Sequence, residues 1–153
     1  MQAKELASAY NPKDTEEKIY QAWEESGYFN PDKLPGKRAE AFTIIMPPPN
    51  ANGHLHAGHA LFITLEDIMI RFERMRGKRA LWLPGTDHAA IATDSKVTKI
   101  LEKEGSKKKD IGREKFLERV DEFVDNSRKI IVTQLRKIGA SLDWSREAFT
   151  YDD

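Results

Sequence analysis

The chain contains no cysteine among its 153 residues. This absence excludes a disulfide framework, a thiolate metal site and a thiol nucleophile. The charges balance, with 25 Lys and Arg against 25 Asp and Glu, which argues against a uniformly basic nucleic-acid-binding protein. No apolar run approaches the ~18 residues that a membrane span needs, and residues 1–10 lack the apolar core of a signal peptide. We therefore expect a soluble, cytoplasmic chain that does not bind a membrane.

The chain also has few apolar residues for a globular protein. Hydrophobic residues make up 39% and charged residues 33%, against roughly 45–50% and 25% in a typical domain. Disorder is nevertheless not expected, because the net charge is zero and long periodic apolar patterns are present. The length fits one domain with a single core.

A short helix and a linker are predicted before the main domain. Asp14 is a candidate cap for a helix that begins near Pro12, with Glu17 as its capping-box partner. Residues 29–40 are rich in Pro, Lys and Gly, as linkers are. We therefore divide the chain into residues 1–40, an N-terminal helix with its linker, and residues 41–153, the main domain.

The main domain alternates between predicted strands and helices. Apolar residues 41–46 and 80–83 indicate buried strands, and 140–144 indicates a third. The helical pattern covers three longer segments, and the polar stretch 107–110 between the last two indicates a solvated loop; the helices are 55–75, 91–104 and 113–138. This order predicts an α/β fold with a parallel sheet and helical crossovers. Ligands bind such sheets at the carboxyl ends of the strands.

Apolar residues spaced three and four apart predict which helix faces lie in the core. In the first long helix the predicted core stripe consists of Leu61, Leu65, Ile68, Phe72 and Met75. In the longest helix it consists of Phe116, Val120, Phe123, Ile130, Gln134 and Ile138.

All four histidines lie in the loops after the first two strands or beside them: His54, His56, His59 and His88. His56 and His59 are three apart at a helix start, so their rings share one face. A helix N-terminus attracts phosphate, and neutral imidazoles can donate hydrogen bonds to phosphate oxygens. Gly58, between them, leaves space for a flat base. This pattern suits a nucleotide-binding site.

Two alternatives compete with the nucleotide site. His56 and His59 could bind a metal together with Asp87 or His88, but no strong ligand spacing supports this, and we expect no metal site. The histidines could also be ordinary residues of a helix start.

The two loops contain further candidates with competing interpretations. Asp87 could hold a substrate ammonium group, or it could cap the next helix. Pro47, Pro48 and Pro49 could form rigid walls of a small apolar pocket, or could simply end the strand. Residues 71–79 hold five basic residues against Glu73; these favour the dipole at the helix C-terminus, with RNA contact as the alternative.

Three ordered segments resemble one family, the valyl branch of the class I aminoacyl-tRNA synthetases. Residues 47–60 are similar to the segment that carries the His-Ile-Gly-His signature, with Ala57 in place of Ile. Residues 84–93 and 138–147 are similar to two later segments of the same family. The similarity extends over nearly the whole chain. Ala90 replaces a usual Gly and Asp94 a frequent Gln, which we expect to alter substrate affinity.

The resemblance implies a role for each candidate residue. His56 and His59 would contact the ATP phosphates, and Gly58 would leave room for adenine. Asp87 would bind the amino group of valine, and the pocket for the amino acid would be lined by Pro47, Pro48 and Asn50. The implied reaction joins valine and ATP into valyl-adenylate with release of pyrophosphate, followed by transfer to tRNA(Val). Mg²⁺ would accompany ATP.

The resemblance also implies parts that this sequence lacks, namely the family's Lys-Met-Ser-Lys-Ser loop, its editing domain and its anticodon-binding domain. We therefore expect residues 41–153 to form the first half of a Rossmann-type catalytic domain in a valine–tRNA ligase fragment. The alternative is a non-catalytic nucleotide-binding or complementing half of a split synthetase. Because an unpaired sheet edge would be exposed, we expect self-association or pairing with a complementary fragment.

Overall fold

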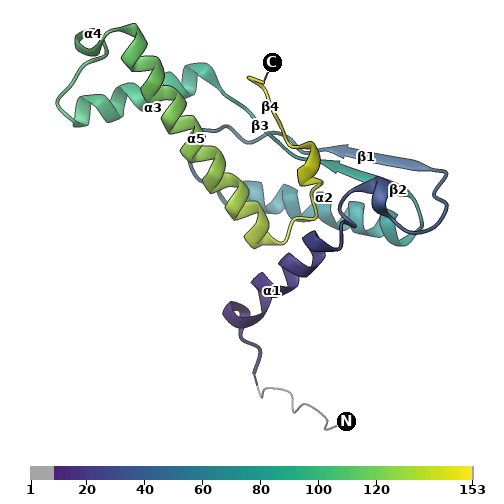
Figure 1. Ribbon diagram of the computed structural model, residues 1–153. Coiled ribbons are helices and arrows are strands. Elements are labelled where there is room, and N and C mark those ends of the chain that lie inside the picture. The colour runs from purple at the N-terminus through teal and green to yellow at the C-terminus, as the bar shows by residue number, and fades with distance from the viewer. Residues whose placement is uncertain (1–8, 153) are drawn as a thin grey trace.

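The computed structural model describes residues 9–152, and its centre is a pair of parallel strands. Strands β1 (Ala41–Ile45) and β2 (Arg79–Leu83) pair with Ala41 opposite Arg79 and Ile45 opposite Leu83. Helix α2 (Ala57–Met75) connects them and packs against them (Figure 1). The predicted strand–helix–strand unit is therefore confirmed, and it sends the loops after β1 and β2 to the same end of the sheet.

A second parallel pair forms beyond β2, where the sequence predicted none. Strand β3 (Gly85–Thr86) pairs with β4 (Ala148–Phe149), so the end of the described chain lies beside the loop after β2 (Figure 1). The predicted third strand at 140–144 is wrong. Asp143 donates its amide to the Trp82 carbonyl at 3.0 Å, but its side chain then caps the 3₁₀ helix η2 (Trp144–Arg146), which ends the extended path.

Three further helices follow: α3 (Ala90–Lys103), α4 (Lys108–Ile111) and α5 (Arg113–Ile138). Helices α3 and α4 and the N-terminal half of α5 form an arm beyond the carboxyl end of the strands (Figure 1). The loop predicted at 107–110 is wrong in part. The Asp110 carboxylate accepts the Lys107 amide at 3.2 Å and thereby starts α4, and the Lys108 ammonium pairs with Asp94 at 2.5 Å. Among residues 9–152, no helix is both long and apolar enough to cross a membrane.

Helix α5 contributes to two apolar cores. Its C-terminal half joins α2, β1 and β2 in a core centred on the buried Trp82, with Ile131 and Leu135 supplied by α5. Its N-terminal half packs on α3 through Phe116 and Val120. The predicted α5 stripe is confirmed at Phe116 and Val120, and in part at Phe123, which is half-buried against the same core. Farther along, the buried positions are Val124, Ser127, Ile131 and Leu135, whereas Ile138 is exposed.

The core stripe predicted for α2 is wrong. Leu61, Leu65, Ile68, Phe72 and Met75 are all more than half exposed. The buried residues of α2 are Ile63 and Ile70. Polar contacts set which face of α2 is turned toward the core. The Asp67 carboxylate accepts the Ser141 amide at 3.0 Å, and the Arg74 guanidinium donates to the Ser141 carbonyl at 2.8 Å.

The basic side chains of residues 71–79 all make contacts within the protein. Arg71 pairs with Asp67 at 2.6 Å and donates to the Gly139 carbonyl. Burial lowers the pKa of Arg74 to about 10. The remaining basic residues each have a carboxylate partner: Arg76 and Lys78 with Glu73, and Arg79 with Asp32. These contacts support a structural role for the stretch.

Helix α1 (Pro12–Glu25) docks on the end of α5 through the buried Tyr20. Its cap is Asn11, whose side chain accepts the Lys13 amide, and not Asp14 as predicted. The predicted linker contains the 3₁₀ helix η1 (Pro31–Lys33). The division of the chain at residue 40 stays a prediction.

Candidate functional site

The loops that follow β1 and β2 are hydrogen-bonded to each other. The Asp87 amide donates to the Pro49 carbonyl at 2.9 Å, and the Ala51 amide donates to the Asp87 carbonyl at 2.6 Å. Asn50 and Asp87 thus face each other across an isolated parallel bridge. The sequence predicted that these loops share one end of the sheet, and the bridge places two candidate residues side by side.

The proline segment has two exposed members and one buried member. Pro47 and Pro48 are exposed, as is Asn50, whereas Pro49 is buried under the paired loops. Gly85 lies beneath this segment, because a Cβ built there would come within 3.9 Å of the Pro48 ring and 3.2 Å of the Ala148 carbonyl oxygen. The rings of Pro47 and Pro48 are therefore accessible to a ligand at the carboxyl end of β1.

His56 and His59 cap the N-terminus of α2 in a reciprocal arrangement. His56 Nδ1 accepts the Gly58 amide at 3.1 Å, and His59 Nδ1 accepts the His56 amide at 3.2 Å. Each Nδ1 is therefore unprotonated, and the remaining proton of each neutral ring lies on Nε2. The ring centroids are 3.9 Å apart. The pair can present two Nε2–H donors beside the positive end of the α2 dipole.

Burial, and secondly electrostatic repulsion from His56 whenever that ring is protonated, lower the pKa of His59 below its usual value. This shift favours the neutral ring, which is the form that can accept the His56 amide. An uncharged donor pair suits a ligand whose own charge changes during a reaction, because it polarises phosphate oxygens without binding them as tightly as a cation does.

The lack of a side chain at Gly58 has a structural cause that the spacing of the histidines does not reveal. A Cβ at this position would lie 3.0 Å from His56 Cε1 and 3.1 Å from His56 Nδ1. These distances are shorter than ordinary van der Waals contacts, so a side chain here would push the His56 ring away from its cap. The role of Gly58 beside adenine stays a prediction.

The Asp87 carboxylate has partners that the sequence did not indicate. Its Oδ1 accepts the Thr150 hydroxyl at 2.9 Å and the Ala89 amide at 3.2 Å. The alternative prediction, that Asp87 caps the next helix, is therefore confirmed only in part. Asp87 accepts the amide of Ala89, which precedes α3, and not an amide of the first turn of α3. Thr150 was missed because 63 residues separate it from Asp87.

Two other residues tie the loop after β1 to the helices. The Lys96 ammonium on α3 donates to the Asn52 carbonyl. Gln134 on α5 accepts the Leu55 amide through Oε1 at 2.8 Å. Neither residue carries a local sequence signal, because their partners are 44 and 79 residues away. Asp94, which departs from the family pattern, pairs with Lys108 of α4.

The other two histidines have different surroundings. His54 is exposed, and His88 stacks on the Tyr151 ring with centroids 4.9 Å apart. Within residues 9–152 no group of three or more His, Asp or Glu side chains is placed to hold a metal ion.

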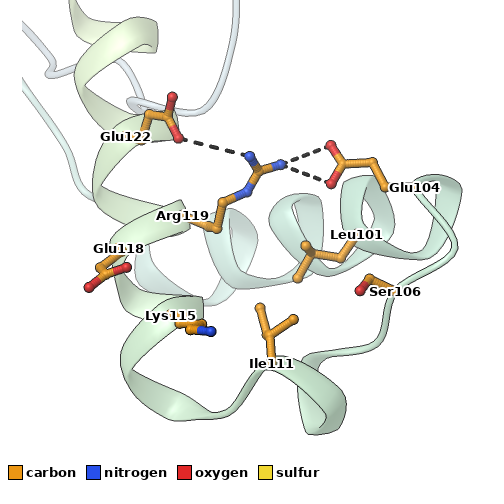
Figure 2. A pocket seen from close by; sticks show the side chains of 8 residues that line it. All are labelled: Leu101, Glu104, Ser106, Ile111, Lys115, Glu118, Arg119 and Glu122. Carbon is orange, nitrogen blue, oxygen red and sulfur yellow. Dashed lines mark hydrogen bonds and ion pairs between the residues drawn. The ribbon is translucent and has the colours of Figure 1, made fainter.

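Two hollows of the described structure lie away from these loops. One, of about 470 Å³, lies between α3, α4 and α5, and Figure 2 shows Arg119 crossing it to reach Glu104 at 2.8 Å. The other, of about 1040 Å³, lies between α1 and the ends of α2 and α5. None of the candidate residues lines either hollow.

The parallel strands and the paired loops at their carboxyl ends define an α/β protein with its candidate ligand site at the usual edge of such a sheet. A family model described as tRNA synthetases class I (I, L, M and V) matches residues 18–153. The chain therefore belongs to this family of class I tRNA synthetases.

Curated relatives point to one branch of the family. The chain is 50% identical to a valine–tRNA ligase of Treponema denticola and 53% identical to one of Clostridium perfringens, in both cases over all of this chain and 17% of the relative. A valine–tRNA ligase of Carboxydothermus hydrogenoformans is 54% identical over 97% of this chain and 16% of that protein. The chain thus spans about a sixth of the length of these relatives.

A solved structure supports the fold. The LeuRS of Agrobacterium radiobacter K84, determined in a ternary complex with tRNA and LeuAMS, superposes with a TM-score of 0.69 at 20% identity. The match covers 94% of this chain and 16% of that chain. Together with the family model, this likeness confirms the predicted α/β fold as a Rossmann-like half of a class I synthetase domain.

Proposed function

We propose that this chain is the ATP- and valine-binding part of a valine–tRNA ligase. The observation that carries the proposal is the bridge between Asn50 and Asp87, at the edge of the sheet where α2 begins with His56 and His59. The similarity to curated valine–tRNA ligases supports valine as the amino acid. The reaction joins valine and ATP into valyl-adenylate with release of pyrophosphate, and the valyl group is then transferred to tRNA(Val).

Each candidate residue has a role in this proposal. The Nε2–H groups of His56 and His59 donate to the ATP phosphates and stabilise the charge that develops as pyrophosphate leaves. Gly58 allows adenine to lie against the backbone. Asp87 binds the ammonium group of valine. The pocket for valine is lined by the exposed side chains of Pro47, Pro48 and Asn50. Mg²⁺ enters with ATP, bound mainly by phosphate oxygens and water.

Valine-dependent exchange of radiolabelled pyrophosphate into ATP tests the proposal. Wild-type exchange should require valine, and His56→Ala, His59→Ala and Asp87→Ala should each reduce it by about a hundredfold or more. His54→Ala is the matched control, because His54 is exposed and lies two residues before the cap. Exchange that survives all three site substitutions would contradict the site assignment.

The same assay separates this proposal from a non-catalytic nucleotide-binding half. That alternative predicts ATP binding without valine-dependent exchange. The assay also measures selectivity. A pocket distinguishes amino acids that differ by one methylene, such as valine and isoleucine, by only about 1–3 kcal/mol, and an apolar pocket only weakly rejects an isostere with a hydroxyl group, such as threonine. We therefore expect exchange with isoleucine and threonine as well as valine.

We further propose contact with tRNA(Val) and association with a second copy or a complementary fragment. The exposed apolar residues of α2 support association, because monomeric proteins rarely expose a continuous apolar surface of this kind. The cytoplasmic location expected from the sequence stays a prediction.

A further inference from the structure

The two carboxylate oxygens of Asp87 differ in their contacts. Oδ1 accepts the Thr150 hydroxyl at 2.9 Å and the Ala89 amide at 3.2 Å. Oδ2 has no hydrogen-bond partner among residues 9–152. The carboxylate is therefore held through one oxygen and left open at the other.

The direction of the Thr150 hydroxyl is fixed by its own contacts. Its oxygen accepts the His88 amide at 2.9 Å, and its proton is thereby directed toward Asp87 Oδ1. The Thr150 amide donates to the Thr86 carbonyl at 3.1 Å, which continues the β3–β4 pairing. Thr150 is thus hydrogen-bonded to both sequence neighbours of Asp87, which are Thr86 and His88.

The main chain of Asp87 is fixed from the opposite side. Its amide and carbonyl bond to Pro49 and Ala51 of the loop after β1. With the backbone held by one segment and the side chain by another, rotation of the carboxylate requires loss of the hydrogen bond to Thr150.

We propose that Thr150 is a positioning residue, which turns Asp87 so that Oδ2 faces the ammonium group of the amino-acid substrate. This inference rests on the proposed role of Asp87 in binding valine. A pre-aligned acceptor strengthens binding, because the ligand does not have to order the side chain. The hydroxyl contributes no contact of its own to the amino acid.

Binding of valine to the full chain, measured by titration calorimetry, tests the proposal. Thr150→Val should weaken valine binding by about tenfold, because the ligand would then have to order the Asp87 side chain itself. Thr150→Ser keeps the hydroxyl and should bind valine with the affinity of the wild-type chain. The affinity for ATP should not change in either variant. Thr133→Val is the matched control, because the hydrogen bond of the Thr133 hydroxyl in the described part of the chain is to the Lys129 carbonyl within α5.

Asp87→Asn separates failure of this inference from failure of the proposed function. If Asp87→Asn binds valine as well as the wild type does, Asp87 does not bind the substrate. If Asp87→Asn loses binding and Thr150→Val keeps it, Asp87 binds valine but Thr150 does not position it.

Amide hydrogen exchange of Ala89 tests the positioning role without a ligand. This amide donates to Asp87 Oδ1 and not to Thr150. Its protection should fall in Thr150→Val and return in Thr150→Ser. Protection that is unchanged in Thr150→Val would overturn the proposal whether or not valine binds.

Discussion

At the scale of single residues, Ala89 is held in a conformation that its side chain disfavours. Its φ of 47° and ψ of 53° lie in the left-handed region, and it is the only non-glycine residue with positive φ among residues 9–152. Its amide donates to Asp87 Oδ1, and its carbonyl accepts the Thr93 amide at the start of α3. The strain therefore lies where the loop of the candidate site turns into a helix, and such strain gathers at functional sites.

Replacing Ala89 by Gly should raise the free energy of unfolding by about 1 kcal/mol, because glycine adopts this region without a steric penalty. Ala90→Gly is the matched control. Ala90 begins α3 and has no positive φ to relieve, so Gly should lower the free energy of unfolding there. Urea unfolding of both variants measures the difference, and equal destabilisation by the two substitutions would contradict strain at Ala89.

At the scale of elements, the docking of α1 depends on one buried hydroxyl. The Tyr20 hydroxyl donates to the Ala140 carbonyl at 2.9 Å and accepts the Trp144 indole N–H at 2.8 Å. Burial raises the pKa of Tyr20 to about 12, so the hydroxyl keeps its proton near neutral pH. Glu24 and Arg136 add an ion pair at 2.9 Å between α1 and α5.

Tyr20→Phe should lower the free energy of unfolding by about 1–3 kcal/mol, because it leaves the carbonyl of the buried Ala140 and the half-buried Trp144 indole N–H without this partner. Tyr28→Phe serves as the control, since Tyr28 is about half exposed and a surface substitution usually changes stability by less than ~0.5 kcal/mol. Urea unfolding followed by circular dichroism compares the two variants. If they unfold at the same urea concentration, the hydroxyl bridge does not stabilise the docked helix.

Local sequence signals located most elements and missed contacts between distant segments. Gly139, with φ of 85°, ends α5 where the sequence placed its stop. The strands predicted at 41–46 and 80–83 also end within one residue of β1 and β2. Thr150 and Lys96 could not be found in this way, because their roles depend on partners 63 and 44 residues away.

The face of α2 that packs on the sheet could not be predicted because two of its faces are apolar. Leu65 and Phe72 lie on one, and Ile63 and Ile70 on the other. The sequence predicts that the longer apolar stripe, with Leu65 and Phe72, faces the core. In the structure, Asp67 and Arg74 hydrogen-bond to Ser141, and these contacts turn the shorter stripe, with Ile63 and Ile70, toward the core. A helix that is apolar on most of its circumference is typical of one buried within a larger protein.

At the scale of the whole molecule, α2 carries an exposed stripe of large apolar residues: Leu61, Leu65, Ile68, Phe72 and Met75. We expect this stripe to drive association of the isolated chain, because burying it against a second copy removes apolar surface from water. Light scattering after size-exclusion chromatography should show a mass that rises with concentration. The double variant Leu65→Glu and Phe72→Glu should stay monomeric and keep its fold, since both side chains are more than half exposed.

Ile91→Glu is the control for this prediction, because Ile91 is 91% exposed on α3 and lies outside the stripe. It should associate as the wild type does. A wild-type chain that stays monomeric at every accessible concentration would contradict association. Equal loss of association in Ile91→Glu and in the double variant would show that added negative charge, and not the α2 stripe, controls the assembly, because both changes lower the net charge while only one alters the stripe.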